Sequence, residues 1–344
     1  MSSLLFKRIF FVSAFLALCA VRCHKESPAE PQSPSSRYTT FKVEGRHLVD
    51  RYGEKVVLRG VNAMIIYWDK LGNVTYPEIA KTGANVVRIF WMNDPIATAS
   101  DLSRTLANCI QNHMIPMPCV WMATGKWDQL DDCVDFWCKG DIAAVLKGHE
   151  KNILVNIANE AGDGNVTDAQ YRAGYEKAVN RMRTAGIRCP LVIDASNWGR
   201  GEKYVLNNAR YLIDKDPEHN LIFSWHPWDP ISWGGTKKRI QATIDSVVVK
   251  EIPFIIGEFS RSEQADSRAS STPIEWRFIM EYAHQNEIGW LPWVWWCCSE
   301  PNDGHSLTQD KLYGHWDNSP WGVEVAVTSP FSIQNTSVRP KSMQ

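Results

Sequence analysis

The chain has 344 residues, 44% of them apolar, which is enough to form a large buried core. Its formal net charge is −1, so the composition offers no basic surface for nucleic acid and we expect no nucleic-acid partner. Sixteen tryptophans are an excess that suits stacking on ligand rings, although core packing accounts for about half of them.

The N-terminus has the pattern of a secretory signal peptide. Lys7 and Arg8 precede an apolar stretch over Ile9–Val21, which is too short to span a bilayer comfortably. We therefore predict a signal peptide over residues 1–23, export from the cell and no membrane span.

Residues 24–38 are rich in proline and serine and predict a disordered tether, followed by a single domain over residues 39–344. Lipid attachment at Cys19 or Cys23, as in a bacterial lipoprotein, is an alternative that would hold the protein at the cell surface. The residues before both cysteines are poor for the cleavage that this attachment requires. Secretion without a lipid is therefore the favoured interpretation.

Seven cysteines follow the predicted signal peptide, and an odd number leaves at least one thiol free unless Cys23 is kept or a bond joins two chains. Cys133 and Cys138 are close enough in sequence to pair. No spacing of cysteine and histidine resembles a metal site, so we expect neither a metal nor another cofactor.

Phe41–Val57 contains Gly45 and Gly53 and predicts a short N-terminal β-hairpin that covers the bottom of the next unit. Eight strand candidates come next, as short apolar runs rich in β-branched residues whose starts are 29 to 38 residues apart. They are Val56–Asn62, Asn85–Trp91, Ile115–Trp121, Ile153–Glu160, Pro190–Ser196, Leu221–Pro227, Pro253–Phe259 and Gly289–Trp295.

Helical patterns lie between these strands. They cover Thr75–Thr82, Asp101–Asn112, Asp141–Lys147, Thr167–Ala185, Gly201–Asp214, Thr236–Lys250 and Thr272–Asn286. Thr167 is a candidate N-cap, and Pro273 after Thr272 fits the first position of the last helix.

Strand and helix alternating eight times predict an α/β fold, a single (β/α)8 TIM barrel with the short N-terminal β-hairpin. The competing fold is an open doubly wound sheet. It is disfavoured because no glycine-rich phosphate loop follows the first strand.

Polar residues stand where several predicted strands end. In a parallel barrel the carboxyl ends of the strands meet on one face, which carries the active site. The second strand contains Arg88, the fourth ends at Asn159 and Glu160, the sixth runs into His226, and the seventh ends at Glu258. These side chains are therefore expected to converge.

Two glutamates facing each other across the barrel mouth can serve as the catalytic pair of a retaining glycosidase, whose two carboxyl groups lie about 5–5.5 Å apart. Glu258 is the candidate nucleophile, and a nearby Arg88 would lower the pKa of its carboxyl group. Glu160 is the candidate acid and base, and its pKa must be raised in the free enzyme. Asn159 is placed to bind the sugar 2-hydroxyl.

His226 is a candidate for hydrogen bonds to the sugar or to the carboxylates, and Trp295 is the candidate floor under the reacting sugar. Each residue also has a structural interpretation when taken alone. Asn159 and Glu160 suit a helix start, Arg88 a structural ion pair and His226 a structural histidine. Their predicted meeting on one face favours the catalytic interpretation.

The motifs together resemble glycoside hydrolase family 5 of the clan A glycosidases, and most of all its bacterial-type endo-β-1,4-mannanases. The resemblance is carried by LRGVN at 58–62, IAKTGANVVRIF at 79–90, ATG at 123–125, NIANE at 156–160, FSWHPW at 223–228, IIGEF at 255–259 and GWLPWVW at 289–295. It implies that Glu160 is the acid/base and Glu258 the nucleophile. It also implies family roles for Arg88, His226 and Trp295, and a monomeric enzyme acting on a β-mannan-type polysaccharide.

Two positions depart from the family pattern. Trp228 stands where the family usually has a tyrosine that orients the nucleophile, and an indole N–H can donate a hydrogen bond but cannot accept one. Trp121 stands where the family usually has a histidine. Both tryptophans are therefore candidate sugar-binding residues with altered chemistry.

Three functions remain open on the sequence. The favoured one is a secreted, retaining endo-β-1,4-mannanase that cleaves mannan, glucomannan or galactomannan by double displacement. The second is a β-1,4-endoglucanase of the same family. The third is a carbohydrate-binding pseudoenzyme, for which Trp121 and Trp228 are the supporting features.

Overall fold

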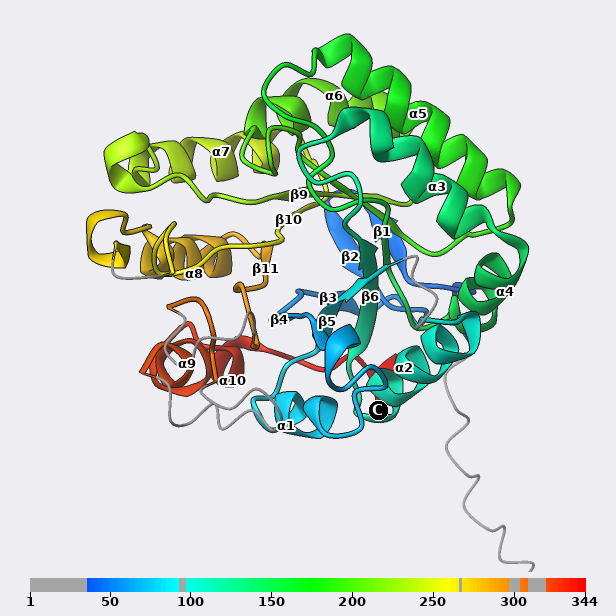
Figure 1. The fold of residues 1–344 in the computed structure, drawn as a ribbon, viewed down its shortest axis with the longest axis horizontal. Coiled ribbons are helices and arrows are strands. Elements are labelled where there is room, and N and C mark those ends of the chain that lie inside the picture. The colour runs from blue at the N-terminus through cyan, green and yellow to red at the C-terminus, as the bar shows by residue number, and fades with distance from the viewer. Residues whose placement is uncertain (1–35, 93–96, 266–267, 297–303, 309–319) are drawn as a thin grey trace, which may run out of the picture. The chain divides into compact units, whose positions relative to one another are not determined.

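In the computed structural model, eight parallel strands follow one another in chain order around a barrel (Figure 1). The structure describes residues 36–92, 97–265, 268–296, 304–308 and 320–344, and residues 36–344 belong to one compact unit. The barrel strands are β4 (Gly60–Ala63), β5 (Val86–Trp91), β6 (Ile115–Val120), β7 (Val155–Asn156), β8 (Leu191–Asp194), β9 (Leu221–Trp225), β10 (Phe254–Ile256) and β11 (Gly289–Trp290).

The first and last strands close the ring. Arg59 and Trp290 form a parallel bridge, and the N–H of Trp290 donates to the carbonyl of Leu58 at 3.0 Å. The N–H of Asn62 donates to the carbonyl of Pro292 at 3.2 Å. The predicted TIM barrel is thus confirmed, and each predicted strand contains one of the observed strands or overlaps it.

Helices surround the barrel, as Figure 1 shows. They are α1 (Thr75–Lys81), α2 (Ala99–Gln111), α3 (Leu130–Cys138), α4 (Gly140–His149), α5 (Asp168–Thr184), α6 (Glu202–Lys215), α7 (Lys237–Val249), α8 (Trp276–Gln285), α9 (Pro320–Val323) and α10 (Ile333–Thr336). Thr167 caps α5 as predicted, in a reciprocal capping box with Gln170.

Two helix predictions were wrong or incomplete. Helix α8 begins at Trp276, so Pro273 is not in its first turn. Pro273 instead bridges to Ser262, and its carbonyl accepts from the N–H of Ile231, which ties two loops together. Helix α3 was not predicted, although its buried Leu130, Cys133, Val134 and Trp137 have helical spacing.

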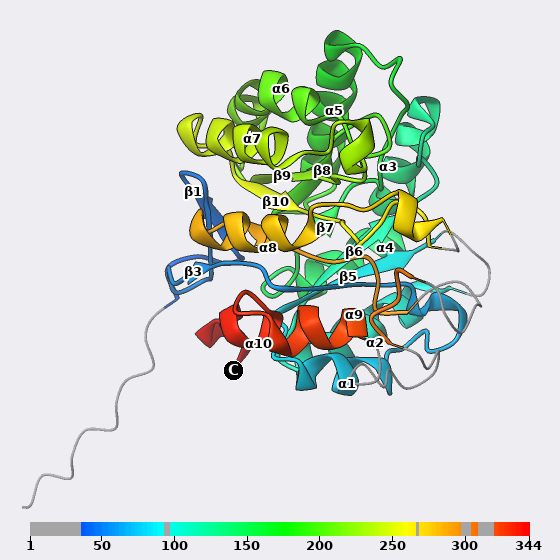
Figure 2. The same ribbon diagram turned by 90° about the vertical axis from the view of Figure 1, so that its left-hand side faces the viewer.

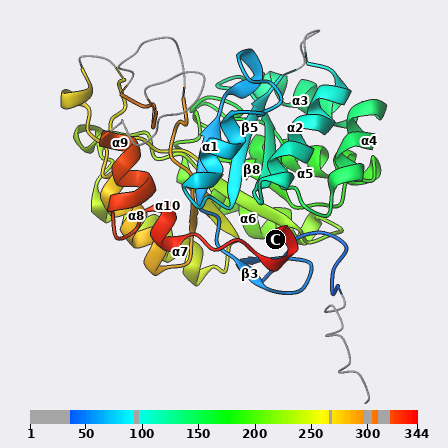
Figure 3. The same cartoon turned by 90° about the horizontal axis from the view of Figure 1, so that it is seen from below.

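The amino ends of the barrel strands are sealed by a three-stranded antiparallel sheet, which contains the predicted hairpin and one further strand. It consists of β1 (Lys42–Glu44), β2 (His47–Val49) and β3 (Lys55–Val56), and it lies at one end of the barrel in Figure 2. The C-terminal segment runs beside β3 (Figure 3), where the N–H of Ser342 donates to Asp50.

An apolar plug fills the barrel interior above this sheet. It combines Phe41, Leu48 and Val56 of the sheet region with one or two side chains from each barrel strand or its approach, namely Leu58, Val86, Ile115, Met117, Leu154, Val192, Ile222, Ile255 and Leu291. A wholly apolar layer at this end leaves polar chemistry to the other end of the barrel.

Cys133 and Cys138, which are close enough in sequence to pair, form no disulfide, and both are free thiols. They lie five positions apart on α3, so their side chains diverge by about 140° around the helix axis. Cys297 and Cys298, together with the predicted signal peptide and most of the predicted tether, lie outside the described residues. Within the described ranges, no helix combines the length and apolar character needed to cross a bilayer.

Candidate active site

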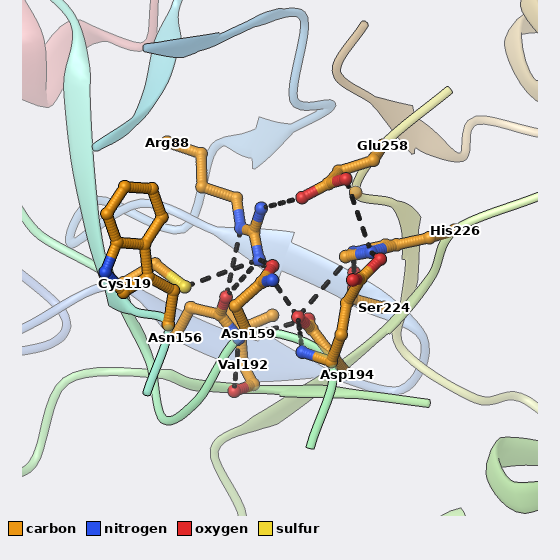
Figure 4. A network of polar contacts seen from close by, with 12 residues as sticks. Arg88, Cys119, Asn156, Asn159, Val192, Asp194, Ser224, His226 and Glu258 are labelled. Carbon is orange, nitrogen blue, oxygen red and sulfur yellow. Dashed lines mark hydrogen bonds and ion pairs between the residues drawn. The ribbon is translucent and has the colours of Figure 1, made fainter. Parts of the chain in front are cut away.

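A polar layer lies directly above the apolar plug, toward the carboxyl ends of the strands. Side chains on one face of a strand recur every second residue. Arg88, Asn156, Asp194 and Ser224 each come two residues after a plug residue of the same strand or its approach and point into the same interior. Figure 4 shows them converging with His226 and Glu258.

Arg88 is the centre of this layer. Its guanidinium donates to Glu258 Oε1 at 2.6 Å and to Asp194 Oδ2 at 2.9 Å, and all three groups are buried. It also donates to the side-chain oxygens of Asn62, Asn156 and Asn159 at 2.7–3.0 Å. A buried cation needs such partners, and the rigid planar fork fixes the carboxylates that it contacts.

Glu160 and Glu258 face each other across the mouth, bridged by His226. One oxygen of each carboxyl group and one ring nitrogen of His226 all lie within 4.8 Å of one another. His226 Nδ1 is 2.8 Å from Glu160 Oε1 and 3.8 Å from Glu258 Oε2, while its Nε2 lies 3.1 Å from Ser224 Oγ. An oxygen of Glu160 and one of Glu258 thus lie closer together than the about 6.5–9.5 Å that leaves room for a water molecule between two carboxyl groups.

Asp194, at the end of β8, positions the segment that carries Glu160. Its Oδ2 accepts the backbone N–H of Glu160 at 3.1 Å and lies 3.6 Å from His226 Nε2. The backbone of Glu160 has φ +48°, in the left-handed region that a non-glycine residue rarely adopts. The bond from Asp194 holds this conformation.

The charges of the buried cluster favour one retained proton. The cluster contains three carboxyl groups, those of Glu160, Asp194 and Glu258, and one guanidinium, that of Arg88. Complete ionisation of the carboxyl groups would therefore leave two negative charges uncompensated. Burial, followed by the charge of Asp194, raises the pKa of Glu160 to about 8. Burial lowers the pKa of His226, which favours its neutral form.

Burial also raises the pKa of Glu258, while His226 and Arg88 act in the opposite direction. Arg88 lowers this pKa as expected, but desolvation outweighs its effect and the net shift is upward. Arg88 donates directly to Glu258 and not to Glu160, which favours the charged form of Glu258 over that of Glu160.

A cleft opens above the two glutamates. Part of its lining is an apolar cluster of Met64, Phe90, Trp121 and Trp293. Polar and aromatic groups make up the rest around the glutamates, namely Thr124, Asn159, Trp198, Arg200, Trp228, Glu263 and His305. Such a cleft over an acid–base pair suits a ligand with flat apolar faces and many hydroxyl groups.

Comparisons with known proteins agree with this geometry. The family model of cellulases (glycosyl hydrolase family 5) matches residues 121–299. A mannan endo-1,4-beta-mannosidase of Streptomyces lividans is 30% identical over 294 residues, which cover 82% of this chain and 72% of the relative. The chain belongs to glycosyl hydrolase family 5.

Two further family 5 proteins are similar over most of the chain. A mannan endo-1,4-beta-mannosidase of Salipaludibacillus agaradhaerens is 29% identical over 305 residues, covering 86% of this chain and 94% of the relative. The β-mannanase of Thermomonospora fusca in complex with mannohexaose has a TM-score of 0.76 and 27% identity, covering 89% of this chain and 100% of the solved one.

The candidate site residues of this family 5 chain fall into three groups. Glu160, Glu258, Asn159, Trp121 and Trp228 line the cleft. Trp228 donates its indole N–H to Glu258 Oε2 at 3.2 Å, so it contacts the carboxylate that the sequence assigns as nucleophile.

Arg88 and His226 are fully buried beneath the cleft and contact the carboxylates, which for His226 is one of the two alternatives that the sequence left open. Trp295 is 4% exposed and packs in the core, and Trp293 lines the cleft in its place. The reason is that β11 ends at Trp290, so the regular alternation of a strand does not extend to Trp295.

Sequence reasoning missed Asp194, although it ends an apolar run at the carboxyl end of a strand, as Glu258 nearly does. It also missed Trp198, Arg200 and Glu263, which lie on loops where no periodic pattern indicates the direction of a side chain.

Glu160, His226 and Glu258 also have ligand atoms close enough to hold a metal ion. The guanidinium of Arg88 lies 2.6 Å from Glu258 Oε1 and would repel a divalent cation there. We therefore interpret the three groups as an acid–base system rather than a metal site.

Proposed function

We propose that this family 5 chain is a retaining endo-β-1,4-mannanase that hydrolyses internal bonds of mannan, glucomannan or galactomannan. The observation that carries the proposal is a close pair of buried carboxyl groups with unequal surroundings. Glu258 has an arginine partner at 2.6 Å, whereas the pKa of Glu160 is about 8. Similarity to mannan endo-1,4-beta-mannosidases supports mannan as the substrate.

In the first step Glu258 attacks the anomeric carbon, and Glu160 gives its proton to the leaving oxygen. The bond from Glu258 to carbon replaces the glycosidic bond, and the aglycone leaves with the proton. Once Glu258 is bonded to carbon it carries no charge, so Arg88 then has Asp194 as its charged partner beneath the sugar.

In the second step Glu160, now ionised, takes a proton from water, and the hydroxyl oxygen displaces Glu258 from the anomeric carbon. His226 Nδ1 lies 2.8 Å from Glu160 and keeps the carboxyl group oriented through both steps. The product keeps the β configuration because the carbon is inverted twice.

The substrate is tested by measuring reducing ends released from mannan, glucomannan, galactomannan and carboxymethylcellulose. We expect the three mannans to be hydrolysed faster than the cellulose derivative. A faster reaction on carboxymethylcellulose would support the endoglucanase instead. Retardation by mannan in affinity electrophoresis without any product would support the pseudoenzyme.

The stereochemistry is tested by proton NMR during the first minutes of hydrolysis. We expect the β anomer of the new reducing end to form first and the α anomer to follow by mutarotation. An α anomer as the first product would contradict the double displacement.

We also propose that the protein is secreted, with the signal peptide over residues 1–23 removed. Sequencing the N-terminus of the protein from culture medium tests this. Recovery only in a membrane fraction, with lipid on Cys19 or Cys23, would favour the lipid-anchored alternative.

A further inference from the structure

Exposed apolar side chains gather around the cleft. The described residues contain six exposed large apolar side chains, and four of them lie on loops at the carboxyl ends of barrel strands. These are Tyr67 after β4, Trp198 after β8, and Ile231 and Trp233 after β9. A concentration of exposed apolar groups at one rim marks a binding surface rather than chance exposure.

Trp198 lies on the Glu160 side of the cleft. The backbone N–H of Trp198 donates to the carbonyl of Gly162, which is two residues after Glu160. Its indole packs against Gly125, where an added Cβ would lie 2.3 Å from Nε1, and the N–H of Gly125 donates to the carbonyl of Glu160. Because the acid must reach the leaving oxygen, this is the side on which the leaving half of the substrate lies.

Arg200 follows Trp198 by two residues in the loop after β8. It lines the cleft, and its guanidinium lies 5.9 Å from the centre of the Trp233 ring. Trp233 is on a short 3-10 helix (Ile231–Trp233) and is 57% exposed. The cleft wall therefore leads from Trp198 through Arg200 to an exposed indole.

This outer wall is held rigidly by ion pairs. Arg200 contacts Asp229 and Glu263 at 3.2 Å each. Asp229 also pairs with Arg239 at 2.5 Å, and Arg239 pairs with Glu202 at 2.7 Å. Since the network joins the loops after β8, β9 and β10, Trp233 is presented in a fixed position, which reduces the entropy lost when a ligand binds.

We propose that Trp233, with Arg200, forms an outer binding site for a sugar of the leaving half of the polysaccharide. The inference rests on the proposed function, because Glu160 as the acid defines the leaving side. The pyranose face stacks on the exposed indole, and the guanidinium of Arg200, already fixed by its carboxylates, directs N–H groups toward hydroxyls. A polysaccharide is favoured over a protein partner because the surface is continuous with the cleft.

The test uses mannohexaose labelled at its reducing end and 4-nitrophenyl β-mannotrioside, with Trp233→Ala in the full chain. The chromogenic substrate has only a nitrophenyl leaving group and so carries no sugar on the leaving side. We expect kcat/KM for mannohexaose to fall about tenfold relative to that for the trioside, mainly through KM. The cleavage position should also move toward the labelled end.

Two variants serve as controls. Trp233→Phe keeps an aromatic face and should recover most of the mannohexaose activity. Val249→Ala removes part of an even more exposed apolar side chain at the end of α7 and should change neither the ratio nor the cleavage position.

An unchanged ratio and cleavage position in Trp233→Ala would overturn the outer site while leaving the hydrolase proposal intact. Failure of the parent protein to cleave either mannoside would instead remove the proposed function on which the site rests. An altered oligomeric state in Trp233→Ala with unchanged kinetics would assign the surface to a second copy of the chain and overturn the sugar site.

Discussion

The two ends of the barrel interior are built from the same strands but have opposite chemistry. At the amino end, Val86, Leu154, Val192 and Ile222 form part of an apolar plug. Two residues further along, Arg88, Asn156, Asp194 and Ser224 form a buried polar layer. One step of the strand repeat thus separates packing from chemistry, and the plug supplies the dry, rigid base on which the charges are held.

The two ends of the barrel should differ most in the effect on kcat of replacing one glutamate at each end. We expect Glu258→Ala to lose a factor on the order of 10⁴ in kcat, because no carboxylate remains to attack the anomeric carbon. Glu287, near the amino end, contacts Lys55 and Arg46 at the surface, so Glu287→Ala should keep the parental kcat. Parental turnover of mannan by Glu258→Ala would refute the role of Glu258.

Replacing the buried cation Arg88 and replacing the buried apolar side chain Leu154 should both lower the free energy of unfolding, but for different physical reasons. We expect Arg88→Met to lower the free energy of unfolding by about 3–5 kcal/mol, since Glu258 and Asp194 lose their shared cation. We expect Leu154→Ala, in the plug, to cost about 2–5 kcal/mol through its cavity.

The pH dependence of the two losses distinguishes them in urea titrations. The loss in Arg88→Met should shrink at acidic pH, where Glu258 takes up a proton, whereas the loss in Leu154→Ala should stay constant. A loss in Arg88→Met that does not change with pH would mean that charge compensation is not its main role.

The proton on Glu160 should affect the pH dependence of both kcat/KM and the free energy of unfolding. The parental kcat/KM should fall as pH rises through about 8, because the acid form is lost. Glu160→Gln should lower kcat/KM by a factor of about 10²–10⁴ and should lack this alkaline limb.

The stability of the same variant follows from the sign of the shift. The folded pKa of Glu160 is raised above its ordinary value of 4.5, so the folded state keeps a proton that the unfolded state loses. The stability of the parent therefore falls between pH 4.5 and about 8, and Glu160→Gln should gain on it there by a few kcal/mol, an order-of-magnitude figure. Equal pH dependence of unfolding in both proteins would contradict the raised pKa.

The smallest expected effect concerns Trp228, which stands at the edge of the polar layer. Trp228→Phe keeps an aromatic ring but removes the N–H that donates to Glu258 Oε2. We expect kcat to fall by about tenfold, and the acidic limb of the kcat/KM profile to move to higher pH as the carboxylate loses a donor. A rise in KM that exceeds the fall in kcat would show that the indole binds sugar more than it orients Glu258.

Much of the fold was predictable because buried strands in a barrel are short, apolar and regularly spaced, and because Arg88 inside an apolar run requires an anion. Asp194 and Asn156 were missed, although they follow plug residues by two positions as Arg88 does. Trp295 could not be placed, because the chain leaves the strand at Trp290 and alternation no longer applies. Trp233 depends on the path of a loop after β9, which no local pattern specifies.

The role of Glu258 is tested most directly by trapping the covalent intermediate with a 2-deoxy-2-fluoro-β-mannosyl fluoride and locating the label by peptide mass spectrometry. We expect a single mannosyl ester on the peptide that contains Glu258, with hydrolysis slow enough to detect it. A label on another carboxylate, or inactivation-free turnover that forms the α product, would contradict a nucleophilic Glu258 opposite a protonated Glu160.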